Sequence, residues 1–277
     1  MLSFYFVLII LGAAAVLLSL IYLFMIAPRM FHRPDMSPFS TFFYAHRGLH
    51  DNASDAPENS MAAFCKAVEA GYGMEMDVQL TRDKVPVVFH DYTLERMCGK
   101  PGKVRDYTYE ELRQFSLGKS DERIPKFEDV LNMVGGRVPL IVELKLESTD
   151  LSLCPIADKL LSRYKGLYCI ETFNPLGLLW YRIHRKSVVR GQLSDAFLQQ
   201  DQYNRLPYYF LQSLLFNFVG RPDFIAYNHL YPRIVSRRIC CGLFGAVAVG
   251  WTIKSREELK QAERYFDWYI FEGFIPC

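Results

Sequence analysis

The sequence predicts an α/β protein whose main unit is a (β/α)8 TIM barrel with a small helical insertion, preceded by one N-terminal transmembrane helix. Short apolar runs alternate with helical patterns from residue 42 onward, which is typical of βαβ units around a parallel sheet. Eight such strands fit into roughly 235 residues, close to the ~250 typical of this barrel. A third observation, an N-terminal segment without charged side chains, predicts the helix.

That segment, residues 1–28, contains no Asp, Glu, Lys, Arg or His and exceeds the ~20 apolar residues that cross a bilayer. A cleaved signal peptide would have a basic start and an apolar core of roughly 7–15 residues, so we predict a retained single-pass membrane anchor. Arg29 and Arg33 follow the segment, and basic residues near a span favour the cytoplasmic side. We therefore predict a linker over 29–41 and a barrel, 42–277, that faces the cytoplasm.

Composition excludes several classes of partner. A formal net charge of +2 with no run of basic and aromatic residues argues against nucleic-acid binding. Seven cysteines, an odd number without a Cys-x-x-Cys motif, indicate neither a disulfide framework nor a zinc site. Reduced thiols are consistent with the cytoplasmic side.

Nine segments are strand candidates, and two of them form a hairpin. Residues 73–80 and 85–90 are joined only by "TRDK", whereas parallel neighbours need a crossover of a dozen or more residues. Counting the second arm as an extension leaves eight barrel strands. The candidates are 42–46, 73–80, 85–90, 139–144, 167–173, 187–193, 223–228, 245–251 and 268–273.

Two segments do not fit a simple alternation. Residues 91–137 contain the helix-like pieces "TYEELRQFS" and "PKFEDVLNMV", and we interpret them as a small helical insertion. The aromatic segment 206–220 is either a core helix or a surface that rests on the membrane. We favour the core, because apolar helical stripes are usually buried.

Carboxylates interrupt two of the apolar strands. Glu75 and Asp77 are two residues apart, so in a strand both point to the same face. Buried like charges need compensation, and a bound divalent cation is the simplest one; the alternative is an edge strand whose acids face solvent. Glu143 and Lys145 repeat the spacing on a second strand. Ligation by oxygen from Glu75, Asp77 and Glu143 suits Mg²⁺ or Ca²⁺, and leaves both as alternatives.

Further polar residues stand at strand ends. His46 and Arg47 end the first strand and His90 ends the hairpin, at the mouth where barrel active sites lie. Such a set supports phosphodiester cleavage: a cation, Arg47 and Lys145 neutralise the phosphate, while one histidine accepts a proton and the other protonates the leaving alkoxide. Glu58 orients Arg47, or Ser60 caps the next helix; the sequence leaves both open.

The motifs "AHRG", "PENS", "MEMDVQLTRD", "VVFHD" and "VELK", in this order, resemble the glycerophosphodiester phosphodiesterase family, in a bacterial-type, membrane-anchored form. "VGWTIKSREEL" resembles the family's late Trp-Thr strand, and the resemblance runs from about residue 42 to the end. It implies a barrel enzyme that hydrolyses glycerophosphodiesters to an alcohol and sn-glycerol 3-phosphate with a divalent cation. By motif position it implies His46 and His90 as the acid/base pair, Glu75, Asp77 and Glu143 as metal ligands, and Arg47, Lys145 and Trp251 as substrate contacts.

Two stretches of the sequence depart from the pattern of that family. Two other functions are also considered. "WYIFEGFIPC" replaces a small-residue run ending in Thr-Asp, and "PENS" replaces the commoner "PENT". One rival is a phospholipase-D-like hydrolase of lysophospholipids or other lipid headgroups on the same fold. The other is a non-catalytic, membrane-anchored binding protein, which the full set of motifs opposes.

Overall fold

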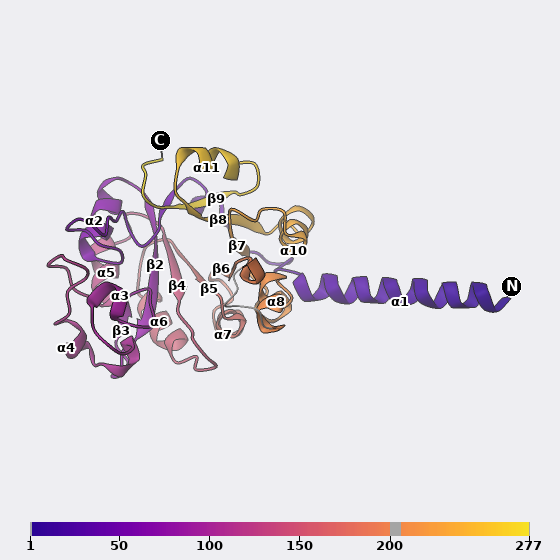
Figure 1. Ribbon diagram of the computed structural model, residues 1–277, viewed down its shortest axis with the longest axis horizontal. Helices are drawn as coiled ribbons and strands as arrows, with labels where there is room; N and C mark the ends of the chain where they lie inside the picture. The colour runs from indigo at the N-terminus through magenta and orange to yellow at the C-terminus, as the bar shows by residue number, and fades with distance from the viewer. Residues whose placement is uncertain (1, 200–205, 277) are drawn as a thin grey trace.

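The structure is a computed structural model that describes residues 2–199 and 206–276. Its main unit is a closed barrel of eight parallel strands, as the sequence predicts (Figure 1). The strand order is β1-β9-β8-β7-β6-β5-β4-β2, and β1 pairs with β2 to close the barrel. The strands are β1 Tyr44–Ala45, β2 Gly73–Leu80, β3 Pro86–Val88, β4 Leu140–Leu144, β5 Tyr168–Thr172, β6 Arg190–Ser194, β7 Phe224–Asn228, β8 Val247–Ile253 and β9 Trp268–Phe271.

The predicted hairpin is also confirmed. β3 pairs antiparallel with β2, with Val78 opposite Val88, and lies outside the barrel ring. The turn places His90 just beyond the end of this arm. The hairpin therefore returns a histidine to the same rim as the residues of β2.

Helices cover the outside of the barrel. Those between or after barrel strands are α2 Met61–Glu69, α5 Phe127–Val134, α6 Leu153–Leu161, α7 Pro175–His184, α8 Leu206–Gln212, α9 Asn217–Gly220, α10 Val235–Arg238 and α11 Arg256–Ala262. Two short helices, α3 Glu95–Cys98 and α4 Tyr109–Leu112, surround a separate small apolar cluster that includes Leu94 and Leu112. The second predicted helical piece, α5, packs instead in the main core beside α2.

The barrel interior changes character along its strands. Ile141 of β4 and Cys169 of β5 are buried in an apolar cluster with Tyr44, Phe224 and Trp268. Two residues further along the same strands, and hence on the same face, stand Glu143 and Glu171. The interior is thus apolar at the start of the strands and acidic toward their C-terminal ends.

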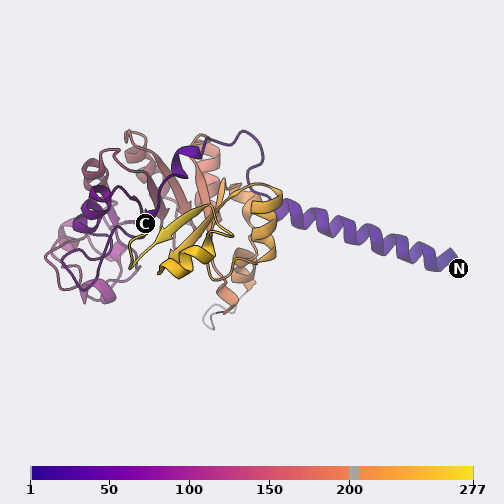
Figure 2. The same ribbon diagram turned by 90° about the horizontal axis from the view of Figure 1, so that it is seen from above.

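Helix α1, Leu2–Ile26, projects from the barrel, and Figure 2 shows the same from a second direction. Its 23 residues from Phe4 to Ile26 are apolar and long enough to cross a membrane. Burial begins at Tyr22: Ile26 is buried, and its carbonyl oxygen accepts a hydrogen bond of 2.9 Å from Asn217 Nδ2. The helix is therefore joined to the barrel at its C-terminal end and exposed from Phe4 to Ile21.

The core-helix prediction for 206–220 is wrong for its first half. No residue of α8 is buried, and Leu206 is 69% exposed, whereas Leu214 and Leu215 after the helix are buried. α8 lies near the barrel end of α1 in both views, and Phe210 and Tyr22 pack against the same core. Leu206 and Tyr209 of α8 are thus exposed close to the candidate membrane helix.

Candidate active site

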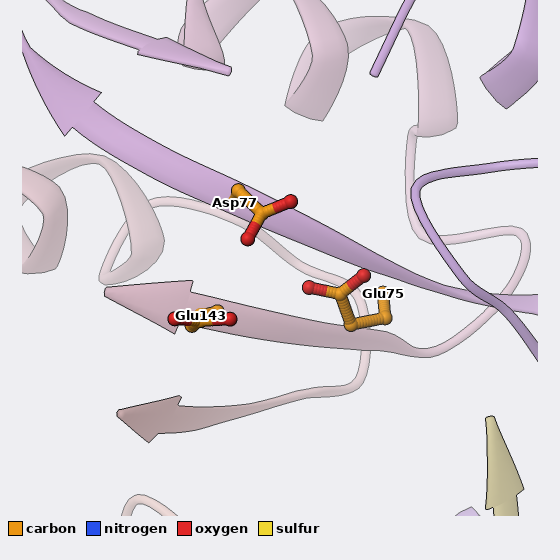
Figure 3. A group of neighbouring side chains, drawn as sticks. All are labelled: Glu75, Asp77 and Glu143. Carbon is orange, nitrogen blue, oxygen red and sulfur yellow. The ribbon is translucent and has the colours of Figure 1, made fainter. Parts of the chain in front are cut away.

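Three carboxylates meet at the C-terminal part of β2 and β4. Asp77 lies opposite Glu143 in the strand register, and Glu75 is two residues earlier on the same face of β2. One oxygen from each lies within 4.8 Å of the others (Figure 3). The spacing of the acids therefore predicts their grouping correctly.

The alternative of a solvent-facing edge strand does not hold. β2 is paired with β1 on one side and with β4 on the other, and Glu75, Asp77 and Glu143 are all buried. Three buried carboxylates in one place are a set of hard oxygen donors, which could hold a metal ion such as Mg²⁺ or Ca²⁺.

Cationic side chains lie closest to two of the three acids, Asp77 and Glu143. Lys145 Nζ lies 3.0 Å from Glu143 Oε1 and 3.5 Å from Asp77 Oδ1, and Arg47 Nε lies 3.5 Å from Asp77 Oδ2. Although burial acts to raise it, the nearby His90, Lys145 and Arg47 hold the pKa of Asp77 below its usual value.

Glu75 is compensated less: Arg47 acts to lower its pKa, and His46 Nε2 lies 3.9 Å from its Oε2. Burial, and then Asp77 and Glu143, raise the pKa of Glu75 well above its usual value. Its Oε2 accepts a hydrogen bond of 3.1 Å from the backbone N–H of Arg47. Negative charge is thus in excess beside Glu75, which fits a cation held by these residues.

Each candidate catalytic histidine is paired with a carboxylate. His46 Nδ1 lies 2.5 Å from Glu272 Oε2, and His90 Nδ1 lies 2.6 Å from Asp91 Oδ1. A carboxylate at Nδ1 selects the tautomer in which this nitrogen carries the proton, so Nε2 of each ring is left to act on a ligand. Burial, and then Arg47, lower the pKa of His46 to about 4 against the opposing effect of Glu272.

The chain turns sharply after β1 to present Arg47. Arg47 has a φ of 55° and Gly48 one of 82°, both in the left-handed region. A Cβ on Gly48 would lie 2.9 Å from the Ala63 carbonyl carbon, so glycine is required there. Both alternatives for "PENS" occur: Glu58 Oε1 accepts from Arg47 Nη1 at 2.7 Å, and Ser60 Oγ accepts from the backbone N–H of Ala63 at 3.1 Å and caps α2.

These residues surround a cavity of about 450 Å³ at the C-terminal ends of the strands. Trp251 forms one wall; its ring lies 5.9 Å from that of Phe173, and its buried Nε1 has no hydrogen-bond partner in the described part of the chain. The predicted residues that line the cavity are His46, Arg47, Glu75, His90, Glu143 and Trp251. Of the other two, Asp77 is buried and paired with Arg47 and Lys145, and Lys145 lines a different cavity of about 260 Å³.

Four residues of the site were missed by sequence reasoning. Glu171 of β5 lies opposite Glu143, is buried, and has an Oε2 that forms no hydrogen bond within residues 2–199 and 206–276. Its signal was available: a lone acid in an apolar strand. Asp91 stands next to His90 in the motif "VVFHD", whereas Glu272 and Arg96 have no such signal. Arg96 bonds both Glu58, at 2.7 Å, and Asp91, at 2.6 Å, and so links the surroundings of Arg47 and His90.

Comparisons with known proteins agree with this geometry. The family model described as "Glycerophosphoryl diester phosphodiesterase family" matches residues 46–264. A glycerophosphodiester phosphodiesterase of Caldanaerobacter subterraneus subsp. tengcongensis is 28% identical over 235 residues, which cover 80% of this chain and 89% of the relative. Human glycerophosphodiester phosphodiesterase 1 is 34% identical over 162 residues, 58% of this chain and 45% of the human protein.

Solved structures share the fold. An Oleispira antarctica phosphodiesterase in complex with the product sn-glycerol-3-phosphate aligns with a TM-score of 0.67 at 22% identity, over 83% of this chain and 92% of that one. A glycerophosphodiester phosphodiesterase from Thermotoga maritima aligns with a TM-score of 0.64 at 24% identity, over 83% and 93%. At these identities the likeness shows the barrel fold.

Proposed function

The chain belongs to the glycerophosphoryl diester phosphodiesterase family and is an enzyme, and we propose that it hydrolyses glycerophosphodiesters to an alcohol and sn-glycerol 3-phosphate. One observation carries the proposal. Two carboxylate-paired histidines, a group of three acids and the cation Arg47 line or adjoin a single cavity of about 450 Å³. Each of these groups has a task in phosphodiester cleavage.

We propose that Arg47 and Lys145 hold the phosphate. Arg47 lines the cavity, and its Nε, which lies 3.5 Å from Asp77 Oδ2, makes no hydrogen bond with any of the described residues. Lys145 lies between Asp77 and Glu143, where its ammonium is held close to the acid group. Fixed positive charge next to the phosphoryl oxygens stabilises the negative charge that develops in the transition state.

Glu75, Asp77 and Glu143 are the proposed ligands of one divalent cation, Mg²⁺ or Ca²⁺. When bound there, the cation supplies positive charge for the phosphate oxygens. Asn59 Nδ2 donates to Asp77 Oδ2 at 2.9 Å, and the backbone N–H of Arg47 donates to Glu75. These contacts orient the carboxylates in the absence of substrate, as is usual for groups behind a metal site.

The two histidines are the proposed proton-transfer groups. The lowered pKa of His46 leaves it neutral at neutral pH, the state in which its Nε2 accepts a proton from the attacking water or glycerol 2-hydroxyl. His90, paired with Asp91, then protonates the leaving alkoxide. If the 2-hydroxyl attacks, a cyclic phosphate forms, and water then opens it to give glycerol 3-phosphate. Trp251 and Phe173 form an apolar wall against which the glycerol carbons pack.

The reaction is tested by incubating the full chain, in detergent, with glycerophosphocholine. We expect glycerol 3-phosphate and free choline, because the proposed acid protonates the alkoxide on the alcohol side of the phosphate. A coupled glycerol-3-phosphate dehydrogenase assay measures the first product and choline oxidase the second. Release of phosphocholine and glycerol instead would contradict the assignment.

A second candidate substrate class is favoured by a row of aromatic rings. The Phe173 ring lies 5.9 Å from both Trp251 and Phe197, and Phe197 lies 5.4 Å from Tyr208 of the exposed helix α8. The row joins the cavity to an apolar surface near α1, a path that suits the acyl chain of a lysophospholipid. Comparing kcat/KM for glycerophosphocholine and lysophosphatidylcholine, below the micellar limit of the latter, distinguishes the two. We expect the deacylated diester to be preferred by about tenfold or more, and the reverse order would support the lipid substrate.

We further propose that α1 is retained as a membrane anchor, with the barrel on the cytoplasmic side. Residues Phe4–Ile26 are long and apolar enough to cross a membrane, and Arg29 and Arg33 follow directly. Fusions to the C-terminus test this: we expect fluorescence from green fluorescent protein and no activity from alkaline phosphatase, which folds only outside the cytoplasm. An active phosphatase fusion would place the barrel on the other side.

A further inference from the structure

A second cavity, of about 420 Å³, lies at the other end of the barrel strands. It is bordered by the start of β6, at Arg190, and by Arg221, which precedes β7. The catalytic cavity opens at the C-terminal ends of the strands, so the two are separate. Residues that directly follow α1, from Pro28 to His32, form its remaining wall.

The side chains around this second cavity are mostly basic. Among the described residues that line it, none is acidic and five are Arg or Lys: Arg29, Arg182, Lys186, Arg190 and Arg221. A neighbouring carboxylate, that of Asp223, lies 3.5 Å from Arg29 and accepts from the backbone N–H of Arg190 at 3.1 Å. Positive charge therefore exceeds negative charge around the cavity.

Arg190 is the most unusual of the five because it is only 2% exposed. Its Nε donates to the Gly220 carbonyl oxygen at 2.9 Å, but its Nη1 has no hydrogen-bond partner among the described residues. Burial, and then Arg29 and Arg182, lower the pKa of Arg190 to about 10 against the effect of Asp223. It is still a cation at neutral pH, with a buried donor that lacks an acceptor.

The cavity also lies at the barrel end of α1. The Arg221 guanidinium stands over the Phe24 ring in the last turn of the helix, 4.8 Å from its centroid, and donates to the Ala27 carbonyl oxygen at 2.8 Å. Met30 and Phe31, just past the helix, are 46% and 75% exposed. With α1 in a bilayer, this is the level of the lipid phosphates, directly outside the hydrocarbon.

We propose that this basic cavity binds the phosphate group of an anionic membrane phospholipid. The phosphate oxygens accept hydrogen bonds from Arg190 Nη1 and from the exposed Lys186, and their charge relieves the repulsion among the five cations. The acyl chains then lie along α1 and the exposed Phe31. The site is independent of the catalytic proposal, and it rests on the proposed anchoring by α1.

Native mass spectrometry of the full chain, released from detergent micelles, tests the site. Phosphatidylglycerol and phosphatidylcholine are added in turn, and the fraction of chain with one bound lipid is measured. We expect the first phosphatidylglycerol to bind about fivefold more tightly or better, because its net charge is not cancelled by a headgroup cation. Equal binding of the two lipids would overturn the proposal.

Charge reversal at one exposed residue locates the site. Lys186→Glu is expected to weaken phosphatidylglycerol binding about fivefold or more, with catalytic turnover and melting temperature unchanged, since Lys186 is exposed and far from the catalytic cavity. Lys159→Glu, an equal charge change on the exposed face of α6, is the matched control and should bind as the unmodified chain does. Loss in both variants, or in neither, would contradict the location.

A final arm separates lipid from free phosphate. Inorganic phosphate is added at millimolar concentration to the chain with phosphatidylglycerol bound. We expect the lipid to be retained, because its acyl chains contribute apolar contacts that the free ion lacks. Displacement of the lipid would show a site for soluble phosphate and would overturn the lipid assignment.

Discussion

His46→Ala and His90→Ala are each expected to lower kcat for glycerophosphocholine by about 10²–10⁴-fold, the usual contribution of a positioned acid or base. Both rings line the catalytic cavity, and both hold Nδ1 against a carboxylate so that Nε2 remains for the substrate. Because the two act on one reaction, the double variant should lose much less than the product of the two losses. The rate of glycerol 3-phosphate release measures kcat of the two single variants and of the double variant.

The leaving group distinguishes the acid from the base. A chromogenic diester that releases p-nitrophenolate needs little protonation of its leaving group. We therefore expect His90→Ala to recover most of its lost rate on this substrate, while His46→Ala stays impaired because the attacking hydroxyl must still lose its proton. The opposite pattern would exchange the two roles. Recovery in both variants would contradict the assignment of His46 as the base.

A control histidine variant distinguishes the loss of a catalytic group from a general loss of folded protein. His184 is an exposed histidine on α7, stacked on Trp180 at 4.6 Å between ring centroids and outside the catalytic cavity. His184→Ala should leave kcat unchanged.

Glu272→Gln should lower kcat by about 10–100-fold, less than His46→Ala does, because it removes the carboxylate that orients His46 and leaves the ring in place. Near-unmodified turnover in either active-site alanine variant would remove that residue from the mechanism.

The barrel was predictable because its signals are local. The apolar runs, the helical patterns between them and the four-residue link in the hairpin all lie within short windows, and the structure confirms the strands and the antiparallel arm. The grouping of Glu75 with Asp77 follows from spacing alone. The exposure of helix α8 was the less favoured of two alternatives, because its apolar pattern is like that of a core helix and the sequence does not show that it lies near α1.

The partners of the catalytic residues depend on how the barrel closes. Glu272 is 226 residues from His46 in the chain, and they meet because β9 pairs with β1, with Phe271 opposite Ala45. The final segment looked like a departure from the family pattern, yet it supplies this carboxylate. Arg96 is similar: its place between Glu58 and Asp91 depends on how the 91–137 region folds back on the barrel. No short-range pattern in the sequence encodes either contact.

Glu75→Gln is expected to weaken the binding of a divalent cation by about 10²-fold, equivalent to about 2.8 kcal/mol, and to reduce turnover in parallel. The substitution keeps the size of the side chain and removes the charge that hard cations prefer. Glu75 is the most informative of the three acids because it lacks the ion pairs with Lys145 that Asp77 and Glu143 make. Binding of Mn²⁺ to chelator-stripped chain, measured by electron paramagnetic resonance, reports affinity independently of activity.

Substitution of two other acids, Glu128 and Glu171, tests whether the three proposed ligands are the correct ones. Glu128→Gln, on the exposed face of α5, should change neither cation affinity nor turnover. Glu171→Gln should weaken binding less than Glu75→Gln, because Glu171 adds negative charge beside Glu143 but lies outside the group of three. A larger effect at Glu171 would mean that β5, rather than β2, supplies a principal ligand. Full turnover in excess chelator would leave the acid group without a bound cation in the reaction, since side chains such as Arg47 and Lys145 would then neutralise the phosphate.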